Sequence, residues 1–361
     1  MHRIKTCHKV PACFSAIVIL MLFSSCRTEE SETVTILPDL IMLEEPDVFI
    51  SSGKNEIYYP DQVEFIKNNG LAVLDSQTNL IHIVTDQGEA AATFGGQGRG
   101  PGETVYPRTF QVSDQFIYVI DSVLMIVLQF SFEGEFIRSF NFDTGVFEAV
   151  IAVADGGVYY RSALGKDDKL ILKTDTQRSE SDLFGEAMGK PFRLIDMQSQ
   201  RQMLQEGDIP ELFKNRVVPI YSNEHLYVFL NSYSRLQKYS PEGDLLWEAD
   251  IDLPVNEFIF NRAVEQAREQ GDPNAVPTIN YITSMTVADG ETWLLWYPHE
   301  NASRKIVRIN REGDISALYE LPEEPDDQKR SYSDIAIDPA EGFIYLSSPL
   351  TGNIYRTVIP E

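Results

Sequence analysis

The chain has 361 residues, 43% of them hydrophobic and 24% charged, and its 55 Asp and Glu against 30 Lys and Arg give a formal net charge of −25. This length is enough to bury the core of one large domain. The negative charge argues against nucleic acid and anionic lipid surfaces as binding partners.

Residues 1–25 predict a secretory signal peptide. Three basic side chains precede an apolar run at 16–23 that is too short to span a membrane. Two serines and Cys26 follow, and small residues before a cysteine resemble the lipobox of bacterial lipoproteins. We therefore expect cleavage before Cys26, which becomes the lipid attachment site. The alternative is an ordinary signal peptide cleaved near the same point, with Cys26 as a spare thiol.

Residues 26–32 predict an acidic tether between the lipid and the folded domain. Glu29, Glu30 and Glu32 lie directly after Cys26. An acidic cluster at this place resembles the signal that sends some lipoproteins to the outer face of the outer membrane. The sequence therefore predicts a lipid-anchored protein of the outer membrane and is compatible with display on the cell surface. The other cysteines leave with the signal peptide, so no disulfide is expected.

Residues 33–361 predict a single domain built from six repeats. Short apolar runs of strand composition recur at 70–76, 116–122, 157–162, 226–232, 292–298 and 343–349. In four repeats a glycine followed by an acidic residue comes next and precedes another apolar segment: Gly88, Gly134, Gly243 and Gly313. Such strands joined by tight turns fit propeller blades. We predict an all-β, six-bladed propeller of four-stranded blades.

The end of the chain predicts how the ring closes. The last repeat has no room for its outer strand, and the segment 33–43 before the first repeat has strand composition. We therefore predict that this N-terminal segment supplies the fourth strand of the last blade, where Pro38 limits it to an edge position. The third repeat fits the pattern least well, because 175–180 replaces the glycine turn.

Two connections, 176–216 and 250–281, are longer than the others. In the second, Phe260, Val264 and Ala267 lie at helical spacing, which predicts a helical insertion near 256–270. An excursion of this kind either shapes a binding surface or caps a blade edge.

The most specific stretch is 94–103, which holds five glycines around Arg99 and ends at Glu103. Its spacing fits neither nucleotide-binding glycine motif, and it follows the first repeat, so we interpret it as the connector to the second blade. Together with the lipoprotein signal, this Gly-Arg-Gly-Pro-Gly-Glu signature resembles the six-bladed, TolB-like propeller lipoproteins whose repeats are similar to NHL repeats. The resemblance implies a lipid-anchored six-bladed ring and no shared biochemical activity.

Five side chains are candidate binding residues. Arg99 and Glu103 either bind an anionic group or, in the alternative, Arg99 anchors the crossing between blades. Asp75, Asp121 and Arg161 end the apolar run of their repeats, as do Asn231 and Ser348. They either form a charged rim on one face of the ring or accept hydrogen bonds from their own turns, an explanation that does not fit Arg161.

The sequence contains no recognised catalytic or metal-binding motif, so we predict no catalytic residue, no cofactor and no metal. His82, His225 and His299 remain after processing, and their places in the repeats differ too much for a zinc site.

These observations predict a lipid-anchored, monomeric and non-enzymatic binding or scaffold protein. Its partner would be a protein, a peptide or a glycan, besides the membrane reached through the lipid, and not nucleic acid. The alternative is an NHL-like propeller enzyme, a lyase or hydrolase that uses channel carboxylates such as Asp75 and Asp121 or a metal.

Overall fold

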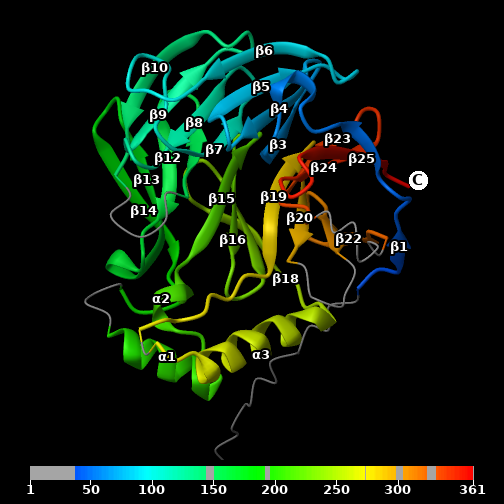
Figure 1. Cartoon of the computed structure of the whole chain (residues 1–361). Helices are drawn as coiled ribbons and strands as arrows, with labels where there is room; N and C mark the ends of the chain where they lie inside the picture. Colours follow the sequence, from blue (N-terminus) through cyan, green and yellow to red (C-terminus); the bar gives the residue numbers. More distant parts are fainter. Residues whose placement is uncertain are drawn as a thin grey trace, which may run out of the picture. The chain divides into compact units, whose positions relative to one another are not determined.

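The structure is a computed structural model that describes residues 37–143, 150–191, 196–272, 274–297, 304–322 and 331–360. The predicted signal peptide at 1–25, Cys26, the tether at 26–32 and His299 lie outside the described residues. Thr35–Glu361 form one compact unit, and its strands build six separate sheets that stand around an axis (Figure 1).

Each sheet contains a blade of four antiparallel strands, one sheet carries a fifth strand at its edge, and five blades are continuous in sequence. Blades one and two contain β3 (Pro60–Ile66), β4 (Gly70–Asp75), β5 (Leu80–Val84) and β6 (Ala90–Gly95), then β7 (Pro107–Val112), β8 (Ile117–Asp121), β9 (Ile126–Phe130) and β10 (Phe136–Asn141). Blades three and four contain β11 (Ala152–Ala154), β12 (Val158–Ser162), β13 (Lys169–Asp175) and β14 (Glu180–Glu186), then β15 (Val217–Ser222), β16 (His225–Leu230), β17 (Arg235–Tyr239) and β18 (Leu245–Asp250). Blade five contains β19 (Ile282–Ala288), β20 (Glu291–Trp296), β21 (Lys305–Ile309) and β22 (Ile315–Glu320). Blade six contains β23 (Asp334–Asp338), β24 (Phe343–Ser348) and β25 (Asn353–Val358), completed by β2 (Asp47–Ile50). The predicted six-bladed propeller is confirmed.

An N-terminal strand closes the last blade as predicted, but the strand is β2 and not the segment 33–43. β2 pairs antiparallel with β25, whereas β1 (Leu40–Met42) adds a parallel fifth strand to the outer edge of blade five. Burial explains the difference. Ile50 of β2 is completely buried and the Phe49 ring contacts Tyr345 edge-on at 5.1 Å, while Leu40 and Met42 stay 44% and 58% exposed. The strand that fills the core therefore takes the closing position.

The glycine turns join the third and fourth strands of blades one, two, four and five, and they also lock neighbouring blades together. Gly243 has a φ of 97°, and an added Cβ would lie 2.6 Å from the Phe184 ring of the preceding blade. Gly134 meets Phe94 in the same way at 2.8 Å. Only glycine allows both the left-handed backbone and this approach. In blade three Asp175 instead accepts two N–H groups of its own turn, which explains why that repeat departs from the pattern.

The hydrophobic core lies mostly between blades, so each sheet is covered on both faces. Ile66, Leu74 and Ile81 of blade one pack with Val119 and Phe130 of blade two in one such cluster. This arrangement explains why the second strands are continuous apolar runs and do not alternate.

Three helices lie together at one end of the propeller, below blades four and five in Figure 1. They are α1 (Met197–Glu206), α2 (Glu211–Lys214) and α3 (Pro254–Glu269). α3 is the helix that the sequence predicts near 256–270, and it buries Ala263, Val264 and Ala267 against blades four and five, whereas α1 and α2 were not predicted. The buried Arg201 of α1 donates to the carbonyl oxygens of Ala267, Gln270 and Asp272 and so caps the end of α3.

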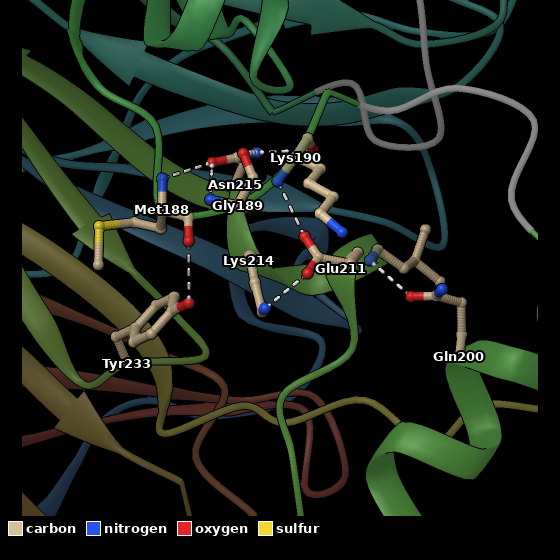
Figure 2. Close-up of polar contacts among 9 residues, drawn as sticks. Met188, Gly189, Lys190, Gln200, Glu211, Lys214, Asn215 and Tyr233 are labelled. Atoms are coloured by element: carbon tan, nitrogen blue, oxygen red, sulfur yellow. Dashed lines mark hydrogen bonds and ion pairs between the residues drawn. The ribbon is translucent and has the colours of Figure 1, made fainter.

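The connection from blade three to blade four is fixed by side chains, as Figure 2 shows. Asn215 accepts the N–H of Met188 at 2.8 Å, and Glu211 accepts the Lys190 N–H at 2.8 Å and the Lys214 ammonium at 2.7 Å. Burial acts to raise the pKa of Glu211, but the bonds from Lys214 and Lys190 outweigh it and hold the pKa below its ordinary value. The side chains of Asn215 and Glu211 thus have structural partners within the connection.

Candidate ligand site at the mouth of the central channel

The first strands of the blades surround the central channel, which opens into a cavity of about 1150 Å³. The turns between the first and second strands of all six blades line this opening, which we call the channel mouth. Concave sites of this size are the usual place for a ligand in a protein. Because the second strands run away from these turns, the mouth lies at the opposite end of the ring from Asp75 and Asp121, which end β4 and β8.

The channel mouth is strongly acidic. Every blade contributes at least one exposed carboxylate, in chain order Asp86, Asp114, Asp155, Glu224, Asp289 and Glu341. Lys67 is the single basic residue among those that line the cavity. A concave surface lined by one sign of charge concentrates ligands of the opposite sign. The mouth therefore favours positively charged groups.

Most of these carboxylates are not used by the fold. Asp114, Glu224 and Glu341 accept no hydrogen bond and form no ion pair with other residues that the structure describes. Asp155 accepts one bond, at 2.7 Å from the Tyr118 hydroxyl. Carboxylate oxygens left open in this way can accept bonds from a ligand.

Three carboxyl groups on the first strands of blades one and six have raised pKa values, Asp61, Glu64 and Asp334, and the last two lie deepest. Glu64 accepts the Val112 N–H at 2.8 Å, and Asp334 accepts the Val63 N–H at 2.9 Å and the Ser284 hydroxyl. Burial raises the pKa of Asp334 to about 7, although these bonds act to lower it. Burial also raises the pKa of Glu64 well above its ordinary value, against the Val112 bond and with help from the negative Asp334.

These deep groups belong to a belt of side chains that joins neighbouring first strands. Gln62 exchanges two bonds with the backbone of Phe110, at 2.8 and 3.0 Å, across blades one and two. Gln111 does the same with Ile151 and Val153 across blades two and three. Glu64 and Asp334 continue the belt, so their oxygens hold the ring together at the channel.

The predicted rim residues Asp75 and Asp121 are fully buried and bind their own connectors. Asp121 accepts the N–H groups of Val105 and Tyr106 with one oxygen and those of Val123 and Leu124 with the other, at 2.5 to 3.0 Å. Asp75 makes the matching four bonds one blade earlier. Neither residue lines the cavity at the channel mouth. A ligand role for Asp75 and Asp121 stays a prediction, because the hydrogen bonds that their carboxylates accept all come from backbone N–H groups.

Arg161 lies at the same end of the ring, within β12. Its guanidinium donates to the Ser162 carbonyl at 3.0 Å and lies 3.9 Å from Asp143, and its Nε is buried without a partner among the described residues. Asn231 instead accepts the Tyr281 N–H at 3.1 Å, and Ser348 accepts a bond from a hydroxyl in its own turn. The structure thus brings these end residues to one face but gives each a separate local partner.

Arg99 and Glu103 have different roles in the glycine-rich connector. Glu103 accepts the Gly100 N–H at 2.7 Å, and a Cβ on Gly98 would lie 1.9 Å from its carboxylate. Glu103 and the glycines therefore shape the loop together. Arg99 is exposed and forms no hydrogen bond or ion pair with the described part of the chain. No contact among the described residues shows Arg99 anchoring the crossing between blades, so both readings of Arg99 stay predictions, whereas Glu103 shapes the loop.

The histidines and the other potential metal ligands of the described chain form no further site. Among the described residues no group of three His, Cys, Asp or Glu is arranged to hold a metal ion. His82 is buried in β5 and His225 bonds the carbonyl of Asn223 at 2.6 Å, so the two lie apart in different blades. No helix in the described ranges has the length and apolar character needed to cross a membrane.

Sequence reasoning missed the acidic mouth, although a signal was present. In five of the six repeats an acidic residue stands in the turn just before the second strand: Asp114, Asp155, Glu224, Asp289 and Glu341. Aligning the repeats on their apolar runs would have placed these residues at one end of the ring.

Comparison with known proteins supports the architecture. The family model DUF5128, described as a 6-bladed beta-propeller, matches residues 49–244. No curated protein matches the sequence significantly. A putative exported protein from Bacteroides fragilis has a similar structure, with 12% identity and a TM-score of 0.53, over 90% of this chain and 100% of that one.

Two further solved structures are similar at comparable identity. A member of the DUF4221 family from Bacteroides vulgatus has 13% identity and a TM-score of 0.50, over 90% of this chain and 97% of that one. Glutaminyl cyclase from Myxococcus xanthus has 10% identity and a TM-score of 0.41, over 89% and 100%. Similarity at these identities shows the fold alone. By the family match and the six observed blades, this chain belongs to the DUF5128 family of six-bladed β-propellers.

Proposed function

We propose that this protein is a lipid-anchored, non-enzymatic binding propeller whose channel mouth holds a positively charged peptide. One observation carries the proposal: all six blades contribute an exposed carboxylate to one cavity that contains a single basic residue. Since several of these carboxylates have no partner within the described chain, a cationic ligand can replace water at them with little rearrangement.

The proposal includes a lipid anchor at Cys26. The signal at 1–25 and its ending at Cys26 support lipid attachment, and the acidic residues that follow support an outer-membrane location with the propeller facing outward. We also place the chain with the lipid-anchored, TolB-like propellers on the Arg99 signature, and the loop-shaping role of Glu103 gives that signature a structural reason.

An enzymatic function receives less support from the site. Among the carboxyl groups with raised pKa values, Glu64 and Asp334 are the most deeply buried and would be the natural acid and base of a hydrolase or lyase. However, Asp334 uses both oxygens to bond Val63 and Ser284, and Glu64 bonds Val112 and Gln62. Groups engaged in this way connect blades, so we favour binding over catalysis.

Binding of a labelled hexalysine peptide at low salt tests the proposal. The variant Asp114→Asn/Asp289→Asn/Glu341→Gln removes three open charges from three blades at the mouth. Because each exposed charge contributes about 0.2–1 kcal/mol, removing three should lower the affinity roughly 3- to 150-fold. Hexaglutamate should not bind, and added salt should weaken hexalysine binding.

A matched control removes the same charge elsewhere. Glu257, Glu265 and Glu269 are exposed on α3, outside the cavity lining, and their triple change to Gln alters the net charge equally. We expect this control to keep hexalysine affinity within about twofold, since screening attenuates distant charges. Equal losses in the two triple variants, or no binding of hexalysine to the unchanged protein, would refute the proposal.

The anchor has its own test. Cys26→Ala should move the protein from the membrane fraction to the soluble fraction, whereas Cys13→Ala, within the predicted signal peptide, should leave it on the membrane. Retention of the Cys26→Ala protein on membranes would refute the lipid anchor. Protease treatment of intact cells then separates the two faces of the outer membrane, because only an outward-facing propeller is cleaved.

A further inference from the structure

One corner of the channel mouth differs from the rest because a stacked tyrosine ring lies between carboxylates of two blades. Tyr221, at the end of β15, lines the cavity beside Glu224 of its own blade and Asp155 of blade three. Its ring stacks on the buried Tyr160, with centroids 5.4 Å apart and an angle of 9° between the planes. The stack holds the ring in place, so it forms a rigid wall.

The surroundings of Tyr221 are negative and open. Its hydroxyl forms no hydrogen bond with other described residues, and Glu224 has no partner there either. Burial raises the pKa of Tyr221, and the nearby charges of Glu224, Asp155 and Glu242 raise it further. The ring therefore stands close to several carboxylates that a ligand can reach.

An aromatic face flanked by carboxylates suits one cationic group above others. A guanidinium is planar, so it can stack on a ring and donate paired hydrogen bonds to carboxylates within its plane. An ammonium is compact and strongly hydrated, and it gains less from a ring. We propose that Tyr221, Asp155 and Glu224 form a subsite for an arginine side chain of the bound peptide.

This inference rests on the proposed function and names the group that the mouth recognises. It is tested by the ratio of hexaarginine to hexalysine affinity, because charge alone treats the two peptides alike. We expect hexaarginine to bind the unchanged protein about 3- to 30-fold more tightly. Tyr221→Leu should bring the ratio close to one, and Tyr221→Phe should preserve it, since the ring face remains.

Two further variants keep the test decisive. Phe132 also lines the cavity, in the turn of blade two, so Phe132→Leu removes an aromatic side chain outside the subsite and should keep the ratio. Glu224→Gln changes an exposed side chain and should lower the ratio even if Tyr221→Leu fails to fold.

The outcomes separate the two proposals. A ratio near one in the unchanged protein, or a ratio that survives in folded Tyr221→Leu and in Glu224→Gln, overturns the arginine subsite. If hexalysine still binds and the triple mouth variant still loses it, the acidic mouth stands without the subsite. If neither peptide binds, both proposals fail.

Discussion

Asp114, in the turn before β8, and Asp121, which ends β8, show two uses of one residue type. Asp121 is completely buried and accepts four backbone N–H groups, whereas Asp114 stands exposed at the channel mouth with no partner in the described chain. The same division repeats around the ring, with Asp75 on one side and Asp289 on the other. Carboxylates at one end of the propeller build connectors, and those at the other end remain open for a ligand.

The largest expected effect comes from removing a connector carboxylate. Asp121→Ala leaves four backbone N–H groups without an acceptor, and bonds to a charged group contribute about 1.5–3 kcal/mol each while additivity is incomplete. We expect the free energy of unfolding to fall by about 3–5 kcal/mol, measured by urea denaturation. Asp114→Ala should change it by less than about 0.5 kcal/mol. Similar losses in both variants would erase the contrast between the two ends.

The next effect concerns Asp334, whose carboxyl group is neither fully open nor a turn acceptor. Its pKa of about 7 in the folded state exceeds the ordinary value of 3.8, so the folded protein holds the proton more tightly. Stability from this group is present below about pH 4 and is lost as the pH rises through about 7, by an amount on the order of a few kcal/mol.

Asp334→Asn isolates that contribution, because other groups also titrate in this range. The unfolding free energy of the unchanged protein, taken relative to that of the variant, should fall steadily from pH 4 to pH 7, because only the unchanged protein loses the Asp334 contribution. A difference that stays constant over this range would show that Asp334 has an ordinary pKa in the folded protein.

A smaller effect distinguishes function from stability at the mouth. Asn223 and Glu224 both have positive φ, 50° and 58°, in the turn between β15 and β16. Glycine suits such a position, so Glu224→Gly should leave the unfolding free energy unchanged or raise it by up to about 1 kcal/mol, yet weaken hexaarginine binding. Glu133→Gly, at a mouth residue outside the positive-φ set, should lower stability instead. A stability loss in Glu224→Gly would point to a structural role for its carboxylate.

The smallest effect is expected at Arg99. Because its side chain is exposed and unpaired within the described chain, Arg99→Ala should alter the melting temperature by no more than about 2 °C. Glu103→Ala should lower it more, since the Gly100 N–H loses its acceptor. If Arg99→Ala proves the more damaging of the two, Arg99 is an anchor after all.

The blades themselves were predictable from sequence because they are local. Each hairpin depends on a turn and on apolar runs that lie close together in the chain, and the turn glycine with its following acid recurs in four blades. The alternative that Asp75 and Asp121 accept turn hydrogen bonds also follows from short-range chemistry. For the same reason the one turn without glycine, after Asp175, was recognised as different.

The closing strand and the site were decided by contacts between distant parts of the chain. Asp334 binds the N–H of Val63, 271 positions away, and the choice of β2 over β1 depends on which strand fills the gap beside β25. The six carboxylates of the channel mouth are likewise far apart in sequence and converge only when the ring closes. The sequence by itself determined the blades, since hairpins form between neighbours in the chain. It also placed an acidic residue in most of the first turns, but only the closed ring decided that these turns meet around one cavity, since they lie far apart in sequence.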